Sequence, residues 1–130
     1  MAPDGSFPPE TKRTKPYGYS LFNLDALATL CQILNTTTDN RWAYQTPDGR
    51  GIRKGIEFLF PFVRDKNTWP FPRDVMYWND WPVAPPFLVF GAVPYGSQPW
   101  LSCWQHLNHA PDVPEVVRNL PVRNPLIWLN

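Results

Sequence analysis

The sequence predicts an all-α protein in which short helices are joined by long proline-rich connections. Seventeen prolines lie among 130 residues, a density that argues against long uninterrupted helices and against central β-strands. Seven tryptophans, eight phenylalanines and five tyrosines supply the apolar surface that a disordered chain lacks. No segment shows the period-two alternation of a half-buried strand, so this apolar surface is assigned to helices.

The charge balance excludes two classes of partner. The formal net charge is +1, so no global field attracts nucleic acid or an anionic membrane. No window approaches the ~20 apolar residues that span a bilayer, and the first residues lack the basic and apolar regions of a signal peptide. We therefore expect neither nucleic acid nor a membrane as a partner, while the oligomeric state stays open.

The first half of the chain predicts an arm and two helices. Residues 1–19 are polar and rich in turn-forming residues, which is typical of an arm or loop. Apolar residues at helical spacing predict a helix over 20–34, with Ser20 as its N-cap. A second amphipathic pattern predicts a helix over 52–63, and Pro61 should either kink this helix or terminate it. The two would form a helical hairpin.

The second half predicts shorter elements. Apolar residues follow Pro85-Pro86 to about Ala92, a further helix is expected over 98–109, and a short one over 113–119 precedes an apolar terminus. The alternation of helix and loop is typical of a helical array whose pairs pack on their neighbours, as in a solenoid or toroid.

Common catalytic and metal-binding signatures are few. Cys103, His106 and His109 have a spacing that resembles a metal site, but a helix would turn His109 away from the other two. We therefore predict no metal site and keep a small metal-binding protein as a weak alternative. Cys31 and Cys103 could form a pair or remain two buried thiols.

Tyrosines and tryptophans are the remaining candidates for chemistry. Tyr17 and Tyr19 stand beside several cations at the start of the first long helix, where a phenol could act as an acid or base. The alternative is that their rings only cover the helix start. In the same way, Trp42, Trp78 and Trp81 could stack on a sugar or serve as packing anchors.

Two blocks of sequence resemble the alginate lyase family, polysaccharide lyases of the (α/α) toroid class. The blocks are Arg13-Thr14-Lys15-Pro16-Tyr17-Gly18-Tyr19-Ser20-Leu21-Phe22-Asn23-Leu24-Asp25-Ala26-Leu27 and Pro47-Asp48-Gly49-Arg50-Gly51-Ile52-Arg53-Lys54-Gly55-Ile56-Glu57-Phe58-Leu59. Trp69-Pro70, Trp81-Pro82-Val83 and Asn124-Pro125-Leu126-Ile127-Trp128 are also similar. The resemblance implies that residues 1–130 are the C-terminal part of such a toroid, hence an incomplete fragment.

The resemblance also implies a reaction and its residues. These enzymes cleave an acidic uronate polymer such as alginate by β-elimination, without a cofactor. By resemblance, Tyr19 would act as the proton donor or base. Arg13 would neutralise the uronate carboxylate, and Lys12 is the alternative candidate for that role. The residues expected to bind substrate are Lys12, Tyr17, Trp78 and Trp81.

One part of the family pattern has no match in this chain. The family uses an Asn-His pair well upstream of its tyrosine, and only about 18 residues precede Tyr19 here. His106 and His109 follow Tyr19 in a different context and receive no role. We therefore expect the isolated chain to be inactive or barely active. A periplasmic or secreted location is implied by the family alone, and a non-catalytic module that binds carbohydrate or a partner is the alternative function.

Overall fold

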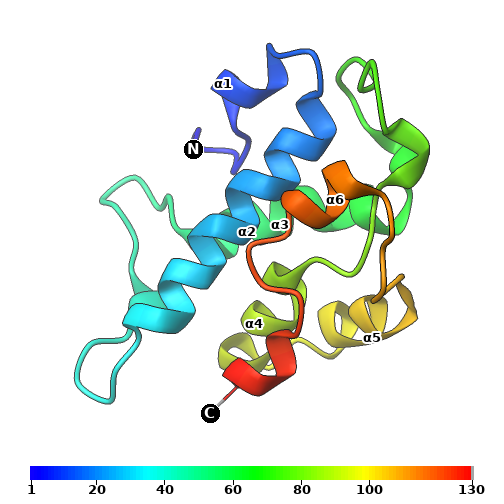
Figure 1. Ribbon diagram of the computed structural model, residues 1–130. Helices are drawn as coiled ribbons and strands as arrows, with labels where there is room; N and C mark the ends of the chain where they lie inside the picture. Colours follow the sequence, from blue (N-terminus) through cyan, green and yellow to red (C-terminus); the bar gives the residue numbers. More distant parts are fainter. Residues whose placement is uncertain (130) are drawn as a thin grey trace.

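The computed structural model describes residues 1–129, and the all-α prediction is confirmed within them (Figure 1). Helical segments alternate with irregular connections, no strand occurs in this range, and the arrangement is consistent with part of an (α/α) toroid. The α-helices are α1 (Pro8–Thr11), α2 (Pro16–Leu34), α3 (Ile52–Arg64), α4 (Pro86–Tyr95), α5 (Gln98–His106) and α6 (Pro114–Arg118). The 3₁₀-helices are η1 (Arg41–Ala43), η2 (Lys66–Thr68), η3 (Trp78–Asp80) and η4 (Pro125–Trp128).

Helix α2 begins four residues earlier than the sequence predicted. Pro16 occupies its first turn, where the missing N–H of proline costs nothing. Ser20 is therefore not the N-cap: it lies inside the helix, and its hydroxyl donates to the carbonyl of Pro16 at 2.7 Å. The cap is the carboxylate of Asp74, a residue far away in sequence that no local pattern could identify.

Helix α3 matches its predicted amphipathic pattern. Ile52, Ile56, Leu59 and Val63 are buried, and the helix continues one turn beyond Pro61 to Arg64. Pro61 has no backbone N–H, so the helix lacks one hydrogen bond there. Because Pro61 is exposed, water reaches the backbone at this position. The sequence predicted that Pro61 would either kink or end the helix, and the helix does not end there.

Helix α4 is the centre of the core. Phe87, Leu88, Val89 and Phe90 have no exposed surface, and α4 packs most extensively against α2 and α5. The helix extends past the predicted end at Ala92 because Gly96, at φ 60°, supplies the left-handed C-cap. Helix α5, capped by Ser97, ends at His106 instead of His109.

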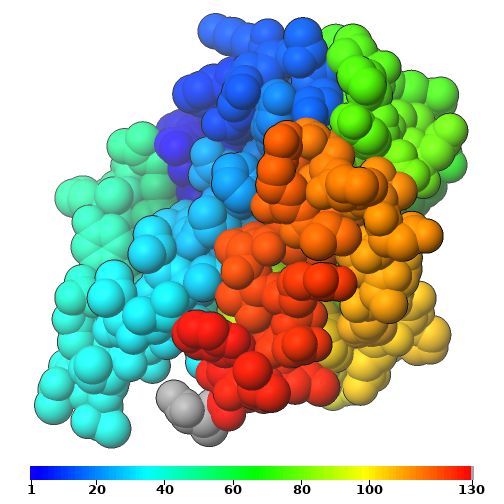
Figure 2. Space-filling view, viewed as in Figure 1, coloured from blue at the N-terminus to red at the C-terminus, as the bar shows by residue number. Residues whose placement is uncertain are grey.

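The two ends of the chain are packed against the helices. Residues 1–19 are not one arm or loop, because they contain α1 and the first turn of α2, and Phe7 is buried in the core. At the other end, η4 contacts α4, and the Gln32 amide donates to the carbonyl of Trp128 at 2.7 Å. Figure 2 shows this C-terminal segment, in red, covering the lower face of the molecule beside α2.

Two further findings concern the cysteines and membranes. Cys31 and Cys103 are both free thiols and partly exposed, so the two do not form a pair. Within the described residues, every helix is too short or too polar to cross a bilayer.

Candidate functional site

The start of α2 brings Arg13 and Tyr19 together. The guanidinium carbon of Arg13 lies 3.8 Å from the centre of the Tyr19 ring, and the guanidinium also bonds to Glu10 at 3.1 Å. Arg13 is exposed and Tyr19 is half-buried, so both are accessible from solvent. Tyr19 lies within the first turns of α2 instead of on a loop, and the helix fixes the direction of its side chain.

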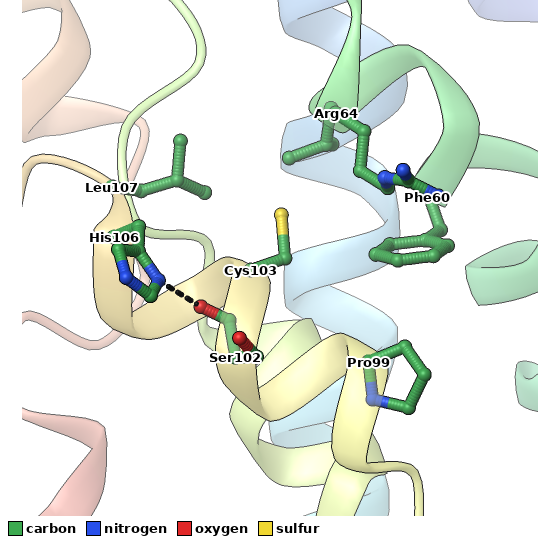
Figure 3. A pocket seen from close by; sticks show the side chains of 8 residues that line it. Phe60, Arg64, Pro99, Ser102, Cys103, His106 and Leu107 are labelled. Atoms are coloured by element: carbon green, nitrogen blue, oxygen red, sulfur yellow. Dashed lines mark hydrogen bonds between the residues drawn. The ribbon is translucent and has the colours of Figure 1, made fainter.

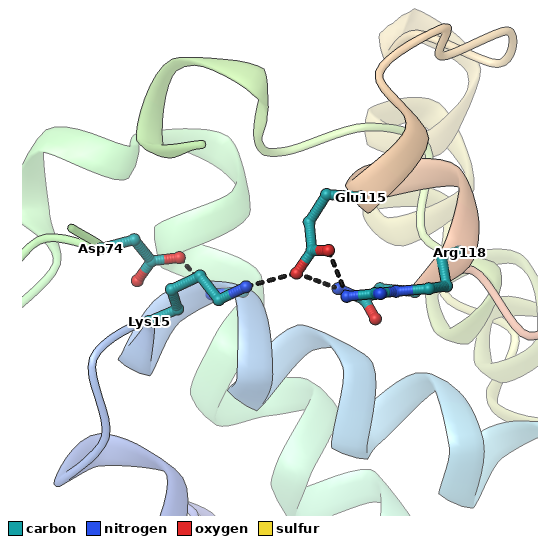
Figure 4. Close-up of polar contacts among 6 residues, drawn as sticks. Lys15, Asp74, Glu115 and Arg118 are labelled. Carbon is teal, nitrogen blue, oxygen red and sulfur yellow. Dashed lines mark hydrogen bonds and ion pairs between the residues drawn. The ribbon is translucent and has the colours of Figure 1, made fainter. Parts of the chain in front are cut away.

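Lys15 joins this pair, although the sequence did not single it out. Its ammonium lies 5.0 Å from the centre of the Tyr19 ring and 5.3 Å from that of Tyr77. It also forms an ion pair with Glu115, which bonds to Arg118 on the same helix, α6 (Figure 4). The hydrogen bond to Glu115 raises the pKa of Lys15, and the same contact lowers the pKa of Glu115. Lys15 thus remains cationic beside Tyr19.

Asp74 holds the connection between α3 and α4 against the start of α2. Its two carboxylate oxygens accept hydrogen bonds from the backbone N–H groups of Tyr17 at 2.8 Å and Gly18 at 2.9 Å. The next residue, Val75, donates its N–H to the carbonyl of Thr14 at 3.0 Å. Burial raises the pKa of Asp74, and the two N–H donors oppose this shift. The connection is therefore attached on both sides of Pro16, to Thr14 before α2 and to Tyr17 and Gly18 within it.

Lys66 organises the turn that carries the two candidate tryptophans. Its ammonium donates to the carbonyls of Trp78 at 2.5 Å and Trp81 at 2.7 Å, and it lies 4.7 Å from the Trp78 ring centre. Arg73 approaches the same ring at 5.3 Å. Burial lowers the pKa of Lys66. Trp78 is half-buried, so part of its ring faces solvent, and both cations lie close to the ring.

Trp81 and Tyr17 are packing residues in this structure. Trp81 is 4% exposed, and its indole nitrogen lies close to Gly18, where an added Cβ would come within 3.0 Å. Tyr17 has no exposed surface, donates its hydroxyl to the carbonyl of Phe62 at 3.0 Å, and packs edge-on against Trp78. Burial raises the pKa of Tyr17 far above its usual range. We therefore leave both out of the set that contacts a ligand.

Lys15 and Tyr19 border a narrow niche at the start of α2 that has no room for a water molecule. The niche is lined by Lys15, Gly18, Tyr19, Trp81, Glu115 and Asn119, from three segments of the chain. Lys12 is exposed on the turn that precedes Arg13, and within the described residues its side chain forms no hydrogen bond or ion pair. Of the residues predicted to be catalytic, Tyr19 lines this niche, and Arg13 lies over the Tyr19 ring but outside the niche lining. Lys15 had a sequence signal, a cation just before a helix-starting proline, but Glu115 had none.

A larger groove lies between α3 and α5, with a volume of about 490 Å³ (Figure 3). Cys103, His106 and Arg64 line it together with apolar side chains. The His106 ring is bonded to the carbonyl of Ser102 at 2.7 Å, while His109 packs edge-on against Trp104 at 4.3 Å and does not line the groove. Among residues 1–129, no three side chains of His, Cys, Asp or Glu are close enough to hold a metal ion.

Comparisons with known proteins point to one family. The sequence model of the alginate lyase family matches residues 1–69, a range that includes Arg13, Lys15 and Tyr19. No curated protein matches the sequence. Among solved structures, the fold is similar to an alginate lyase from Bacteroides ovatus, with a TM-score of 0.71 and 23% sequence identity. The match covers 99% of this chain and 32% of that one, so this chain spans about a third of the length of its structural relative.

Proposed function

Because the chain belongs to the alginate lyase family, we propose that it acts in the cleavage of an acidic uronate polymer by β-elimination, with Tyr19 and Arg13 in the site. The observation that carries the proposal is the position of the Arg13 guanidinium, 3.8 Å from the Tyr19 ring centre, inside the matched residues. An exposed cation beside a phenol on a rigid helix combines a carboxylate-binding group with a proton-transfer group.

The chemistry requires both of these groups. In β-elimination the C5–H bond of a uronate breaks, a C4=C5 double bond forms, and the C4–O4 bond breaks with protonation of O4. The C5 proton is only weakly acidic, so a cation must neutralise the C6 carboxylate and stabilise the enolate-like intermediate. We assign this role to Arg13, with Lys12 as the rival. The C5 proton must pass to a base and O4 must receive a proton. We assign both transfers to Tyr19, which as a phenolate takes the C5 proton and then delivers that proton to O4.

Proton transfer and charge neutralisation are sufficient for this step, so the proposal includes no cofactor. The family resemblance implies an Asn-His pair as well, and the two histidines here, His106 and His109, do not line the niche at Tyr19. We therefore expect the 130 residues by themselves to eliminate slowly or not at all. The proposed location is extracellular or periplasmic, because polyuronates are encountered there.

An elimination assay tests the proposal. The purified chain is incubated with polymannuronate, polyguluronate and polygalacturonate, and the ultraviolet absorbance of the unsaturated product is followed. Binding of the same polymers is measured by isothermal titration calorimetry. We expect Arg13→Ala to weaken binding about tenfold and Tyr19→Phe to abolish any elimination while binding remains.

Two further variants make the assay decisive. Lys12→Ala separates the two candidate cations, since the variant with the larger loss of binding identifies the carboxylate partner. Tyr44→Phe is the matched control, because Tyr44 is an exposed tyrosine at a distant position. Elimination that persists in Tyr19→Phe, or an absence of polyuronate binding, would overturn the proposal.

A non-catalytic carbohydrate-binding module is the second candidate function. It is favoured by Trp78, whose half-buried ring centre lies 4.7 Å from the Lys66 ammonium and 5.3 Å from the Arg73 guanidinium, so a sugar at the ring would have cations near for its carboxylate. Binding without elimination, lost in Trp78→Ala, would favour this function. Trp81→Ala is expected to destabilise the fold instead, because Trp81 is buried.

A further inference from the structure

Tyr77 has a backbone conformation that a tyrosine seldom adopts. Its φ of 64° and ψ of 15° place it in the left-handed region, where the Cβ atom crowds the backbone and glycine or asparagine is favoured. Within residues 1–129 it is the one non-glycine residue with positive φ. Such residues cluster at functional sites, because selection otherwise replaces them by residues without strain.

The surrounding contacts hold Tyr77 in this conformation. On one side, Asp74 and Val75 bond to the start of α2. On the other side, the Lys66 ammonium binds the carbonyl of Trp78, and the Asp80 N–H donates to the carbonyl of Tyr77 at 3.0 Å. The backbone is therefore held in place before and after Tyr77.

The Tyr77 side chain lies beside the proposed site. Its ring is half-buried and lies 5.3 Å from the Lys15 ammonium, which in turn lies 5.0 Å from the Tyr19 ring. Lys15 thus has the rings of two tyrosines within reach of its charge. The hydroxyl of Tyr77 forms no hydrogen bond with any other residue of the described chain, in contrast to the hydroxyls of Tyr17 and Tyr95. It is available to a ligand.

We propose that Tyr77 contacts the polymer, as a binding residue that shares the uronate site with Lys15 and Tyr19. This inference rests on the proposed function. The ring would pack against the C–H face of a pyranose, the Lys15 ammonium would attract the uronate carboxylate, and the free hydroxyl would donate to a sugar oxygen.

Substitutions at Tyr77 separate binding from packing. Tyr77→Gly removes the ring and relieves the left-handed strain, so we expect its melting temperature to equal or exceed that of the unmodified chain. Its affinity for a uronate hexamer should fall about tenfold. Tyr77→Asn also tolerates this region and should give the same result, whereas Tyr77→Phe keeps the ring and should lose about threefold. Tyr44→Ala, at an exposed tyrosine elsewhere, is the control.

Calorimetric titration with a mannuronate hexamer, and with cellohexaose as a neutral control, gives distinct outcomes. A melting temperature that does not fall, together with weaker uronate binding, supports the inference. Binding unchanged in Tyr77→Gly and Tyr77→Asn while Arg13→Ala loses affinity overturns the role of Tyr77 and leaves the proposed function intact. If the unmodified chain does not bind the hexamer, both fail.

Discussion

Helices α2 and α4 both begin at a proline and are capped by a buried carboxylate from a distant segment. Asp74 caps α2 and uses both oxygens, bonding to the N–H groups of Tyr17 and Gly18. Asp25, on α2, caps α4 and accepts one hydrogen bond, from the N–H of Phe87 at 2.9 Å. The other oxygen of Asp25 is buried without a hydrogen-bond partner in the described structure.

The two capping residues have different surroundings: cations lie near Asp74, whereas Asp25 is enclosed in the core. The cations Lys15 and Lys66 offset part of the burial cost of Asp74, and the helix that it caps carries Tyr19, with Arg13 on the turn before the helix. Asp25 is enclosed in the core beneath α4, where burial raises its pKa well above the ordinary value and only the Phe87 N–H opposes the shift. One cap thus positions a charged surface, whereas the other serves packing. A capped helix start becomes a candidate site only through the groups around it.

The largest expected effect is the loss of the Asp74 cap. Asp74→Ala leaves two buried N–H groups without an acceptor, so we expect the free energy of unfolding to fall by about 2–3 kcal/mol. Urea denaturation measures this change. Asp112→Ala is the matched control, because Asp112 is exposed and its side chain forms no hydrogen bond or ion pair within the described residues. Equal stabilities of the two variants would contradict the capping role.

A smaller effect is expected at Asp25, and it depends on pH. The folded-state pKa of Asp25 is raised, so the folded chain holds a proton that the unfolded chain releases above its ordinary pKa of 3.8. The contribution of Asp25 to the free energy of unfolding is therefore at its maximum below pH 3.8 and declines as the pH rises toward the folded-state pKa. Asp25→Asn, which keeps an acceptor for Phe87 without a charge, should remove this decline and gain about 1–2 kcal/mol at neutral pH.

Measuring the free energy of unfolding from pH 4 to pH 8 for both chains checks this prediction. Asp74→Asn provides the comparison: its amide can accept only one of the two N–H bonds, so it should destabilise at neutral pH. A pH dependence of Asp25→Asn equal to that of the unmodified chain would contradict the role assigned to Asp25.

The smallest expected effect concerns the ion pair between Lys15 and Glu115, which joins α6 to the start of α2. Glu115→Gln should cost about 0.5–1 kcal/mol at neutral pH, since both side chains retain some exposure. The pKa of Glu115 is lowered from 4.5, so this contribution is present above pH 4.5 and is lost as the pH falls through the folded-state pKa. A double-mutant cycle with Lys15→Met isolates the pair, and zero coupling would contradict it. The exposed Arg53–Glu57 pair should couple less.

Local patterns were sufficient for most of the helices. The spacing of apolar residues located α3, and turn residues located the break between α4 and α5. The same patterns misplaced the start of α2, because the Asp74 cap comes from 57 residues away. Local spacing also did not distinguish Trp78 from Trp81, or Tyr19 from Tyr17. In each pair one ring is partly exposed and the other is buried.

The sequence by itself determined the helical class, the family resemblance and the proximity of Arg13 to Tyr19, because these depend on residues close together along the chain. Only the tertiary structure brought Glu115 to Lys15 across 100 residues, placed Tyr77 beside them, and buried Tyr17 and Trp81. The physical reason is that charge pairing, burial and backbone strain arise between segments that meet only when the chain folds.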